Sequence, residues 1–203
     1  MVIGLGFLLS NYYISKKNIV FEQIKMEKFE SSELEDIEIL KEDDTPEQPD
    51  PIAPDDKDNN KDKDKDKKKN NEYDYIGILE IPKINFKRGF VSPNSKYNNI
   101  SYNVAIIERS TFPNVDKGNF ILAAHSGVGE KAYFKNLYKL NTGDMAYITY
   151  GNKEYKYKIA RIYTQKKTGK LTIYRNPDKT CLTLITCTKD RDDLQTIYVA
   201  ELI

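Results

Sequence analysis

A composition break near residue 73 decides which part of this 203-residue chain can fold. Residues 55–69 contain only Asp, Asn and Lys, and four prolines stand between residues 46 and 54. Such a stretch cannot bury enough apolar surface to offset the entropy lost on ordering, and proline interrupts helices. We therefore expect a disordered tether over residues 21–72, acidic at first and then rich in Lys, Asp and Pro. One folded domain is expected over residues 73–203.

The N-terminal segment, residues 1–20, carries an apolar run from Val2 to Ile14. As a helix this run spans about 20 Å, whereas the hydrocarbon core of a bilayer is about 30 Å thick. Lys16 and Lys17 follow the run, and no basic residue precedes it. Our interpretation is a membrane anchor whose first part is missing; a buried or surface helix and a cleaved signal peptide stay open. A short helix is one interpretation of residues 21–40, where the periodicity is weak.

The folded part shows the patterns of β-strands. Residues 155–159 (YKYKI) alternate apolar and charged side chains, and Gly151-Asn152 predicts a hairpin turn before them. Because strands do not alternate with helices, we expect an all-β chain of about eight strands in a closed or nearly closed barrel. Strands are predicted over residues 75–81, 104–108, 120–124, 145–150, 154–164, 182–186 and 196–202, and a helix over residues 131–140.

The net charge and the numbers of cysteine and histidine residues argue against nucleic-acid binding and against a structural metal site. The net charge of +1 gives no electrostatic footprint for nucleic acid. The chain has two cysteines and one histidine. A structural zinc site takes about four such ligands, so we expect no metal and no cofactor. If residues 181–187 form one strand, Cys181 and Cys187 lie about 20 Å apart. That separation is too long for a disulfide, so both are expected to be thiols.

Cys187 and His125 are the candidate catalytic residues. A thiol becomes a strong nucleophile as a thiolate, and a histidine can take its proton. His125, the only histidine, follows the apolar run 120–124, and Cys187 ends the apolar run 182–186. If the two strand ends share one rim, thiol and imidazole can meet; on these features alone, a structural cysteine and a loop histidine stay open. Cys181, expected to lie before its strand, is interpreted as structural.

Four segments resemble the sortase family, in the order in which that family carries them. Residues 183–187 (TLITC) resemble the T-L-x-T-C signature that contains the sortase cysteine, and residues 118–127 (GNFILAAHSG) resemble the segment around the sortase histidine. Residues 76–84 (IGILEIPKI) resemble the first barrel strand, and residues 134–144 resemble the stretch after the histidine. Together the resemblance covers residues 75–203.

The resemblance implies an eight-stranded sortase-like β-barrel with short helices and the activity of a cell-wall cysteine transpeptidase. Such an enzyme cleaves the sorting-signal peptides of surface proteins and forms a thioester, here on Cys187. It then transfers the acyl group to an amine of a cell-wall precursor or of a protein lysine. The resemblance also implies an N-terminal anchor in a bacterial membrane, with the catalytic domain extracellular.

One position departs from the family. Sortases carry an arginine on the last strand that helps to bind the substrate and the developing oxyanion. Aligning residues 197–200 with that strand places Gln195 at the position of the arginine. Gln195 can donate a hydrogen bond through its amide, but without charge. Arg191 is the alternative, four residues earlier and in the expected connecting loop.

The sequence also bears on the subtype of sortase and leaves two alternative functions open. The chain shows no second apolar segment at its C-terminal end, unlike pilus-polymerising sortases, so a different type is expected. An L,D-transpeptidase is one alternative, although its cysteine normally sits in an S-H-G-C context and here follows Thr186. A degenerate sortase-like protein that binds sorting peptides with little turnover is the other, and Gln195 favours it.

Overall fold

The computed structural model describes residues 23–27, 29–30 and 74–203 of the chain. The expected anchor at residues 1–20 and the Asp/Lys run at residues 55–69 lie outside this part. Residues 23–27 and 29–30 are helical, within the stretch for which a short helix is one interpretation. Over the described ranges, no helix has both the length and the apolar character that a membrane crossing requires.

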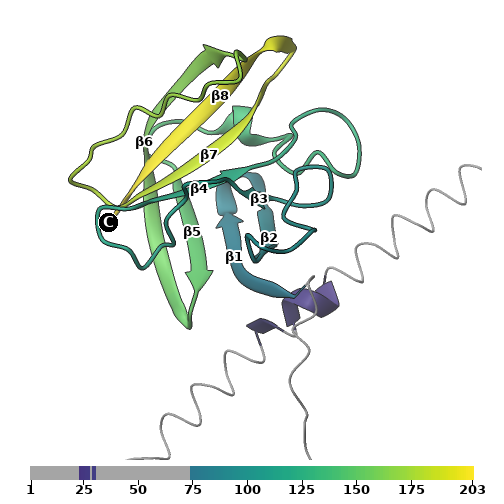
Figure 1. Ribbon diagram of the computed structural model, residues 1–203, viewed down its shortest axis with the longest axis vertical. Coiled ribbons are helices and arrows are strands. Elements are labelled where there is room, and N and C mark those ends of the chain that lie inside the picture. The colour runs from purple at the N-terminus through teal and green to yellow at the C-terminus, as the bar shows by residue number, and fades with distance from the viewer. Residues whose placement is uncertain (1–22, 28, 31–73) are drawn as a thin grey trace, which may run out of the picture.

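Residues 74–203 form eight strands and two 3₁₀ helices (Figure 1). In chain order they are β1 (Tyr75–Ile81), η1 (Pro82–Ile84), β2 (Phe86–Val91), β3 (Ala105–Ile106), β4 (Asn119–Ala123), η2 (Leu137–Lys139), β5 (Met145–Tyr150), β6 (Lys153–Lys166), β7 (Cys181–Thr188) and β8 (Arg191–Leu202).

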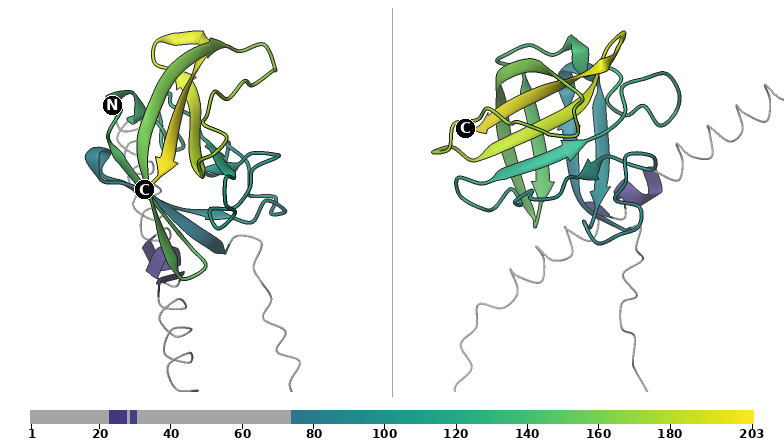
Figure 2. Two further views of the ribbon diagram at one scale, coloured as in Figure 1. Left: turned by 90° about the vertical axis from the view of Figure 1, so that its left-hand side faces the viewer. Right: turned by 45° about the horizontal axis from the view of Figure 1, so that its top comes forward.

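These strands belong to one sheet, in the order β2-β1-β5-β6-β8-β7-β4-β3. Each neighbouring pair is antiparallel except β4 and β7, which run parallel. The sheet curls round until β2 and β3, the two ends of this order, approach each other (Figures 1 and 2). The predicted all-β, nearly closed eight-stranded barrel is therefore confirmed.

The sheet buries apolar side chains on both faces. Large side chains such as Phe90, Tyr157 and Leu184 fill the barrel interior. A second cluster lies on the alternate positions of β4, β7 and β8, and it consists of Ile121, Cys181, Ile185, Ile197 and Val199. Since successive strand residues point to opposite faces, this second cluster covers the outside of the barrel.

Agreement with the sequence is closest where turns bound a strand. β1 and β5 begin and end as predicted, and Gly151 and Asn152 both have φ of 56° in the turn after β5. Both positive values match a type I′ hairpin turn. The sequence pattern missed β2, in which Lys87, Arg88 and Gly89 interrupt the apolar residues. Cys181 is the first residue of β7, so the expectation that it precedes the strand is wrong.

The helix predicted over residues 131–140 is also wrong. The segment is a succession of turns, and only η2 within it is regular. Its backbone N–H groups donate repeatedly to carbonyls three residues earlier. Phe134, Leu137 and Leu140 are buried. A spacing of three matches 3₁₀ winding, so the apolar pattern that predicted a helix is satisfied by these tighter turns.

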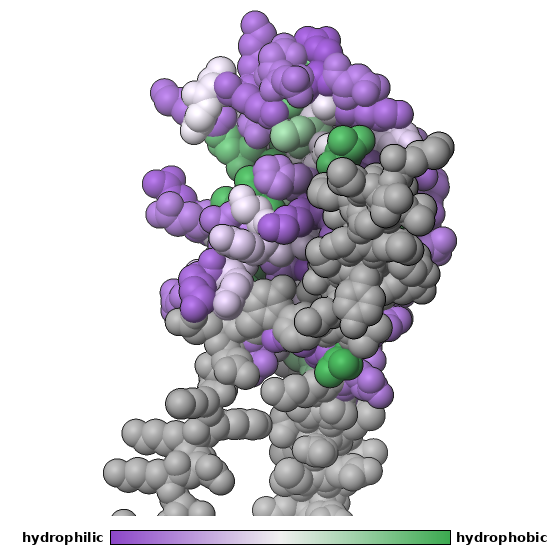
Figure 3. Space-filling view, turned by 90° about the vertical axis from the view of Figure 1, so that its right-hand side faces the viewer, coloured by the Kyte–Doolittle hydropathy of each residue, from purple (hydrophilic) through white to green (hydrophobic). Residues whose placement is uncertain are grey.

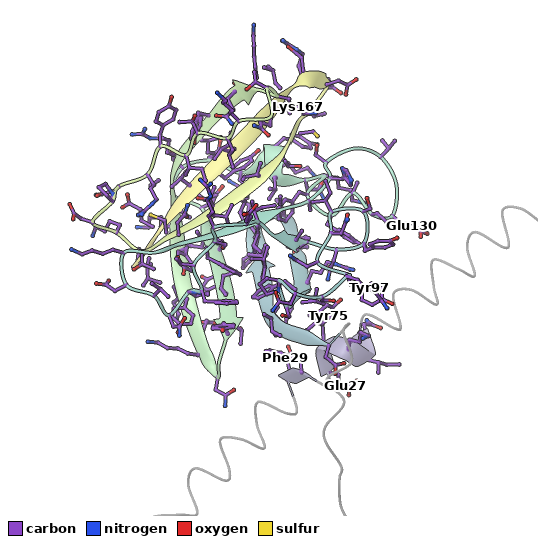
Figure 4. All side chains as sticks on the ribbon, viewed as in Figure 1. Glu27, Phe29, Tyr75, Tyr97, Glu130 and Lys167 are labelled. Atoms are coloured by element: carbon purple, nitrogen blue, oxygen red, sulfur yellow. The ribbon has the colours of Figure 1, made fainter. Side chains whose placement is uncertain are left out.

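The helical residues 23–27 and 29–30 contact the barrel near the start of β1. Lys87 Nζ lies 2.7 Å from Glu30 Oε1, and Lys25 Nζ lies 4.0 Å from Asp74 Oδ1. Figure 4 shows Phe29 close to Tyr75 at this end of the barrel. The Lys87–Glu30 pair is exposed, and such pairs contribute about 0–1 kcal/mol, whereas the Lys25 side chain is only 14% exposed. Because both buried clusters come from residues after 74, the barrel core does not need these N-terminal residues.

Removal of residues 1–72 should therefore leave a folded barrel. We expect the melting temperature to fall by less than about 5 °C, because the two buried clusters of the barrel consist of residues after 74. Circular dichroism melts of the full chain and of the fragment 73–203 measure the difference. A fragment that aggregates, or that melts without a cooperative transition, would show that the domain boundary at residue 73 is wrong.

Candidate active site

The parallel pairing of β4 with β7 brings His125 to Cys187. Asn119 pairs with Cys181 and Ala123 pairs with Ile185, so partners differ by 62 residues throughout (181 − 119 and 185 − 123). Continuing this register by two residues places His125 beside Cys187. In paired strands, side chains at partner positions point to the same face. Both residues then fall at outward positions, His125 two residues beyond the end of β4 and Cys187 near the end of β7, and both line one cleft.

Three hydrogen bonds hold the two strand ends together beyond the last paired residues. Ala124 N donates to Ile185 O at 3.3 Å, and Thr186 Oγ1 donates to Ala124 O at 2.8 Å. Ser126 Oγ donates to Cys187 O at 2.7 Å. Two of these bonds involve Ala124, directly before His125, and one involves Ser126, directly after it, so both neighbours of the histidine are tied to the cysteine strand.

His125 and Cys187 line the same cleft, which has a volume of about 850 Å³. Its other walls are the loop of residues 126–132, which carries Glu130 (Figure 4), and the turn between β7 and β8. Cys187 is half-buried and His125 is exposed. The thiol is therefore open to a peptide on the side where the imidazole stands.

Charged side chains of both signs surround the cleft. Where Figure 3 colours the residues of this side, most are hydrophilic, with a few hydrophobic residues among them. The charged lining residues are Glu130, Lys131, Lys135, Lys189, Asp190 and Asp192. Lys189 Nζ lies 4.2 Å from the ring centroid of Tyr138, a cation–π contact that joins the β7–β8 turn to the segment after His125. No sequence pattern predicts this contact, because Lys189 and Tyr138 are far apart in the chain.

Gln195 is the register partner of Cys187 on β8. Its side chain therefore belongs to the same outer row as the thiol, on the side away from His125. Gln195 is not among the residues that line the cleft. The structure thus brings Gln195 beside Cys187, while the cleft itself opens on the histidine side.

Arg191 is the first residue of β8, so the expectation that it lies in the connecting loop is wrong. Its partner on β7 is Thr188 rather than Cys187. Its Nε and Nη2 donate to the two carboxylate oxygens of Asp193, each at 3.0 Å. Hydrogen bonding within this exposed pair raises the pKa of Arg191 and lowers the pKa of Asp193. The structure brings Gln195, and not Arg191, opposite the cysteine.

Cys181 differs from Cys187 in its surroundings, although both thiols are free. Cys181 is fully buried, and burial raises the pKa of its thiol. Its Sγ lies 3.4 Å from Lys179 O, within reach of a weak hydrogen bond to that carbonyl. A buried thiol with a raised pKa supplies little thiolate. Cys181 is therefore a poor nucleophile, whereas Cys187 stands at an open rim.

Within residues 23–27, 29–30 and 74–203, no group of three or more His, Cys, Asp and Glu side chains is placed to hold a metal ion. The candidate site brings together one thiol on β7, one imidazole just beyond the end of β4 and one amide on β8. These groups can support nucleophilic attack, proton transfer and hydrogen bonding to an oxyanion.

The eight-stranded barrel, with a cysteine on β7 and a histidine just beyond β4, can be compared with known protein families. The sortase domain matches residues 79–203, which is more than half of the chain. The chain therefore belongs to the sortase family.

Individual sortases resemble the same part of the chain. Sortase A of Bacillus anthracis is 25% identical over 125 residues, which are 62% of this chain and 58% of that protein. The match thus spans less than two thirds of that relative. The sortase D5 transpeptidase of Clostridium perfringens is 28% identical, with a TM-score of 0.55, and the match covers 64% of this chain and 79% of that one. Sortase C1 of Streptococcus agalactiae is 26% identical, with a TM-score of 0.55 and coverage of 64% and 67%.

Thr186→Val should weaken the link between the two strand ends. The buried hydroxyl of Thr186 is the donor to Ala124 O, so its loss should lower the free energy of unfolding by about 1–2 kcal/mol. Urea denaturation measures this change. Thr164→Val, on an exposed position of β6, is the control and should change stability by less than about 0.5 kcal/mol. Equal midpoints for parent and Thr186→Val would mean that this bond does not hold the strands.

Proposed function

We propose that this sortase-family chain is a cysteine transpeptidase that cleaves a sorting-signal peptide and transfers its acyl part to an amine. The observation that carries the proposal is the shared cleft of Cys187 and His125, at the ends of two parallel strands held in one register. The lone histidine has no rival in the sequence as the partner of the thiol.

In the first half-reaction, the thiolate of Cys187 attacks the carbonyl carbon of a Thr–Gly-type peptide bond. The C–N bond breaks, and His125 in its protonated form gives its proton to the leaving amine. The products are a thioester on Cys187 and a peptide with a free amino group. Because the cleft lies on the His125 side of the thiol, the leaving peptide departs through it.

In the second half-reaction, an acceptor amine enters the cleft and attacks the thioester carbonyl. Neutral His125 takes a proton from this amine, the C–S bond breaks, and Cys187 leaves as the thiolate. A new amide bond joins the acyl part to the acceptor. The acceptor class that fits this chemistry is a primary amine of a cell-wall precursor or of a protein lysine.

The tetrahedral intermediates of both steps carry a negative oxygen, and Gln195 is the proposed donor to it. Gln195 neighbours Cys187 on β8, and its amide can donate a neutral hydrogen bond. Arg191 is the less favoured alternative, because its guanidinium is held by Asp193 and its register partner is Thr188.

The proposal extends to the rest of the chain. Residues 1–20 are proposed to anchor it in a bacterial membrane, and residues 21–72 to tether an extracellular catalytic domain that begins at residue 73. A type other than pilus-polymerising is proposed for it, on the sequence pattern alone.

A second candidate function is a degenerate sortase that binds sorting peptides with little turnover. The neutral Gln195 opposite the cysteine is the observation that favours it, because removal of one oxyanion donor typically slows a reaction about 10²–10³-fold. The two functions differ in the fate of the thioester. An enzyme releases it to an amine, whereas a binding protein forms none or retains it.

Cys187→Ala should abolish thioester formation, and Cys181→Ala should preserve it to within about threefold. The reason is that Cys187, and not Cys181, shares a cleft with His125. Cys181 is buried, and this burial raises the pKa of its thiol. Intact-mass spectrometry detects the acyl adduct after incubation with short peptides that contain a Thr–Gly bond. Circular dichroism confirms that both variants are folded. Equal loss of the adduct in two folded variants would rule out Cys187 as the specific nucleophile.

Gln195→Arg should raise kcat/KM about fivefold, because a charge-assisted hydrogen bond is about 1 kcal/mol stronger than a neutral one. Gln195→Ala should lower kcat/KM about 100-fold, since the oxyanion donor is lost. Arg191→Ala should change it less than about threefold. Peptide-cleavage kinetics on these variants show whether Gln195 or Arg191 is the oxyanion donor. If Arg191→Ala removes activity and both Gln195 variants are silent, Arg191 is the working residue.

A further inference from the structure

One charged side chain stands on the inward face of the barrel wall. Arg88 pairs with Leu79, which is fully buried in the interior, and the inward positions before and after it are Phe86 and Phe90. Charged residues seldom occupy such positions unless partners hold them, because desolvation of the charge costs free energy. An apolar residue would complete the pattern of β2 at this position. The presence of an arginine at this inward position therefore needs a specific explanation.

The contacts of Arg88 reach across the seam between β2 and the loops that follow β2 and β4. Its Nε donates to Asn103 Oδ1 at 2.8 Å, and Asn103 is fully buried. Its guanidinium carbon lies 3.8 Å from the centroid of the Tyr133 ring. Tyr133 Oη in turn donates to Tyr102 O at 3.0 Å. The planar guanidinium thus stacks on one loop while it is bonded to the other.

Tyr133 is directly joined to the segment that fixes His125. The next residue, Phe134, donates its backbone N–H to His125 O at 2.9 Å, and the Phe134 ring meets the Phe86 ring at 5.7 Å between centroids. β4 ends at Ala123, so His125 lies beyond the strand. The bond from Phe134 closes the loop of residues 126–133 on the histidine. Whatever holds residues 133–134 in place therefore also holds the main chain of His125.

We propose that Arg88 is a positioning residue for His125, acting through Tyr133 and Phe134. The cation–π stack on Tyr133 and the bond to Asn103 clamp the far end of the loop against β2, and the Phe134 bond carries this placement to the histidine. The effect on catalysis rests on the proposed function, in which His125 exchanges protons with the amine. The effect on the position of His125 does not rest on it.

Arginine suits this role for a geometric reason. Its planar group can stack on a ring and donate a directed hydrogen bond at the same time, whereas lysine carries a compact charge on a flexible stem. Arg88→Met should leave the loop end unclamped, and Arg88→Lys should restore the clamp only in part. Tyr133→Leu removes the stacking partner and should reproduce the effect of Arg88→Met.

The test uses the fact that His125 is the only histidine of the chain. In full-length protein made without a histidine tag, NMR shows the imidazole signals of His125 alone. We expect Arg88→Met and Tyr133→Leu to shift or broaden these signals and to change the pH midpoint of their titration. Arg161→Met, an exposed arginine on β6, is the matched control and should leave them unchanged. Melting temperatures are measured for every variant. If Arg88→Met does not fold, the two separate variants Arg88→Lys and Tyr133→Leu provide the test.

Kinetics on Thr–Gly peptides provide the second readout. Arg88→Met should lower kcat about 10–100-fold with KM within about twofold, because misplacement of a catalytic group affects the chemical step more than substrate binding. Unchanged imidazole signals and unchanged kcat in folded variants would overturn the proposal. If the signals respond to Arg88 but neither parent nor variants turn over any peptide, the clamp stands and the proposed function fails.

Discussion

The parallel pairing of β4 with β7 is the constraint on which the rest of the site depends. Its constant offset of 62 residues aligns His125 with Cys187 although they are far apart in the chain. Because side chains alternate between faces, a slip of one residue would turn one of the two toward the barrel interior. The hydrogen bonds of Thr186 and Ser126 across the strand ends oppose such a slip at the point where it would matter.

The two faces of the sheet carry different groups of residues, the barrel core on the inner face and the candidate site on the outer face. The inward positions hold the barrel core, and the outward positions of the same strands hold a second apolar cluster that ends in the row His125, Cys187 and Gln195. Cys181 occupies the buried start of β7 and Cys187 its open end, so one strand carries an inert thiol and an accessible one. The two proposed functions, a transpeptidase and a protein that binds with little turnover, both depend on Gln195, the register partner of Cys187 on β8. Arg88, on the inward face, is the interior position that we propose also serves the site.

Much of this arrangement could be predicted from the sequence, because the strands of the site are apolar runs with polar ends. His125 and Cys187 as candidate catalytic residues, and Gln195 at the position of the usual arginine, follow from local patterns and family resemblance. Three features could not be predicted. The charges of β2 hid its strand pattern, and 3₁₀ turns in residues 131–140 share the apolar spacing of a helix. A bulge between Ile159 and Arg161 reverses the faces of β6, so alternation read from Tyr157 assigns Tyr163 to the interior, whereas it joins the outer cluster.

Cross-linking tests the alignment of the two strand ends most directly. In a Cys181→Ala background, His125→Cys leaves two thiols at positions that the register places side by side. Methane-diyl bismethanethiosulfonate, which bridges thiols only over a short span, should join them within one chain. Mass spectrometry of the digest should then show a linked peptide pair that contains positions 125 and 187. Lys166→Cys in the same background is the control and should give no link to Cys187. Separate singly modified thiols at positions 125 and 187 would contradict the account.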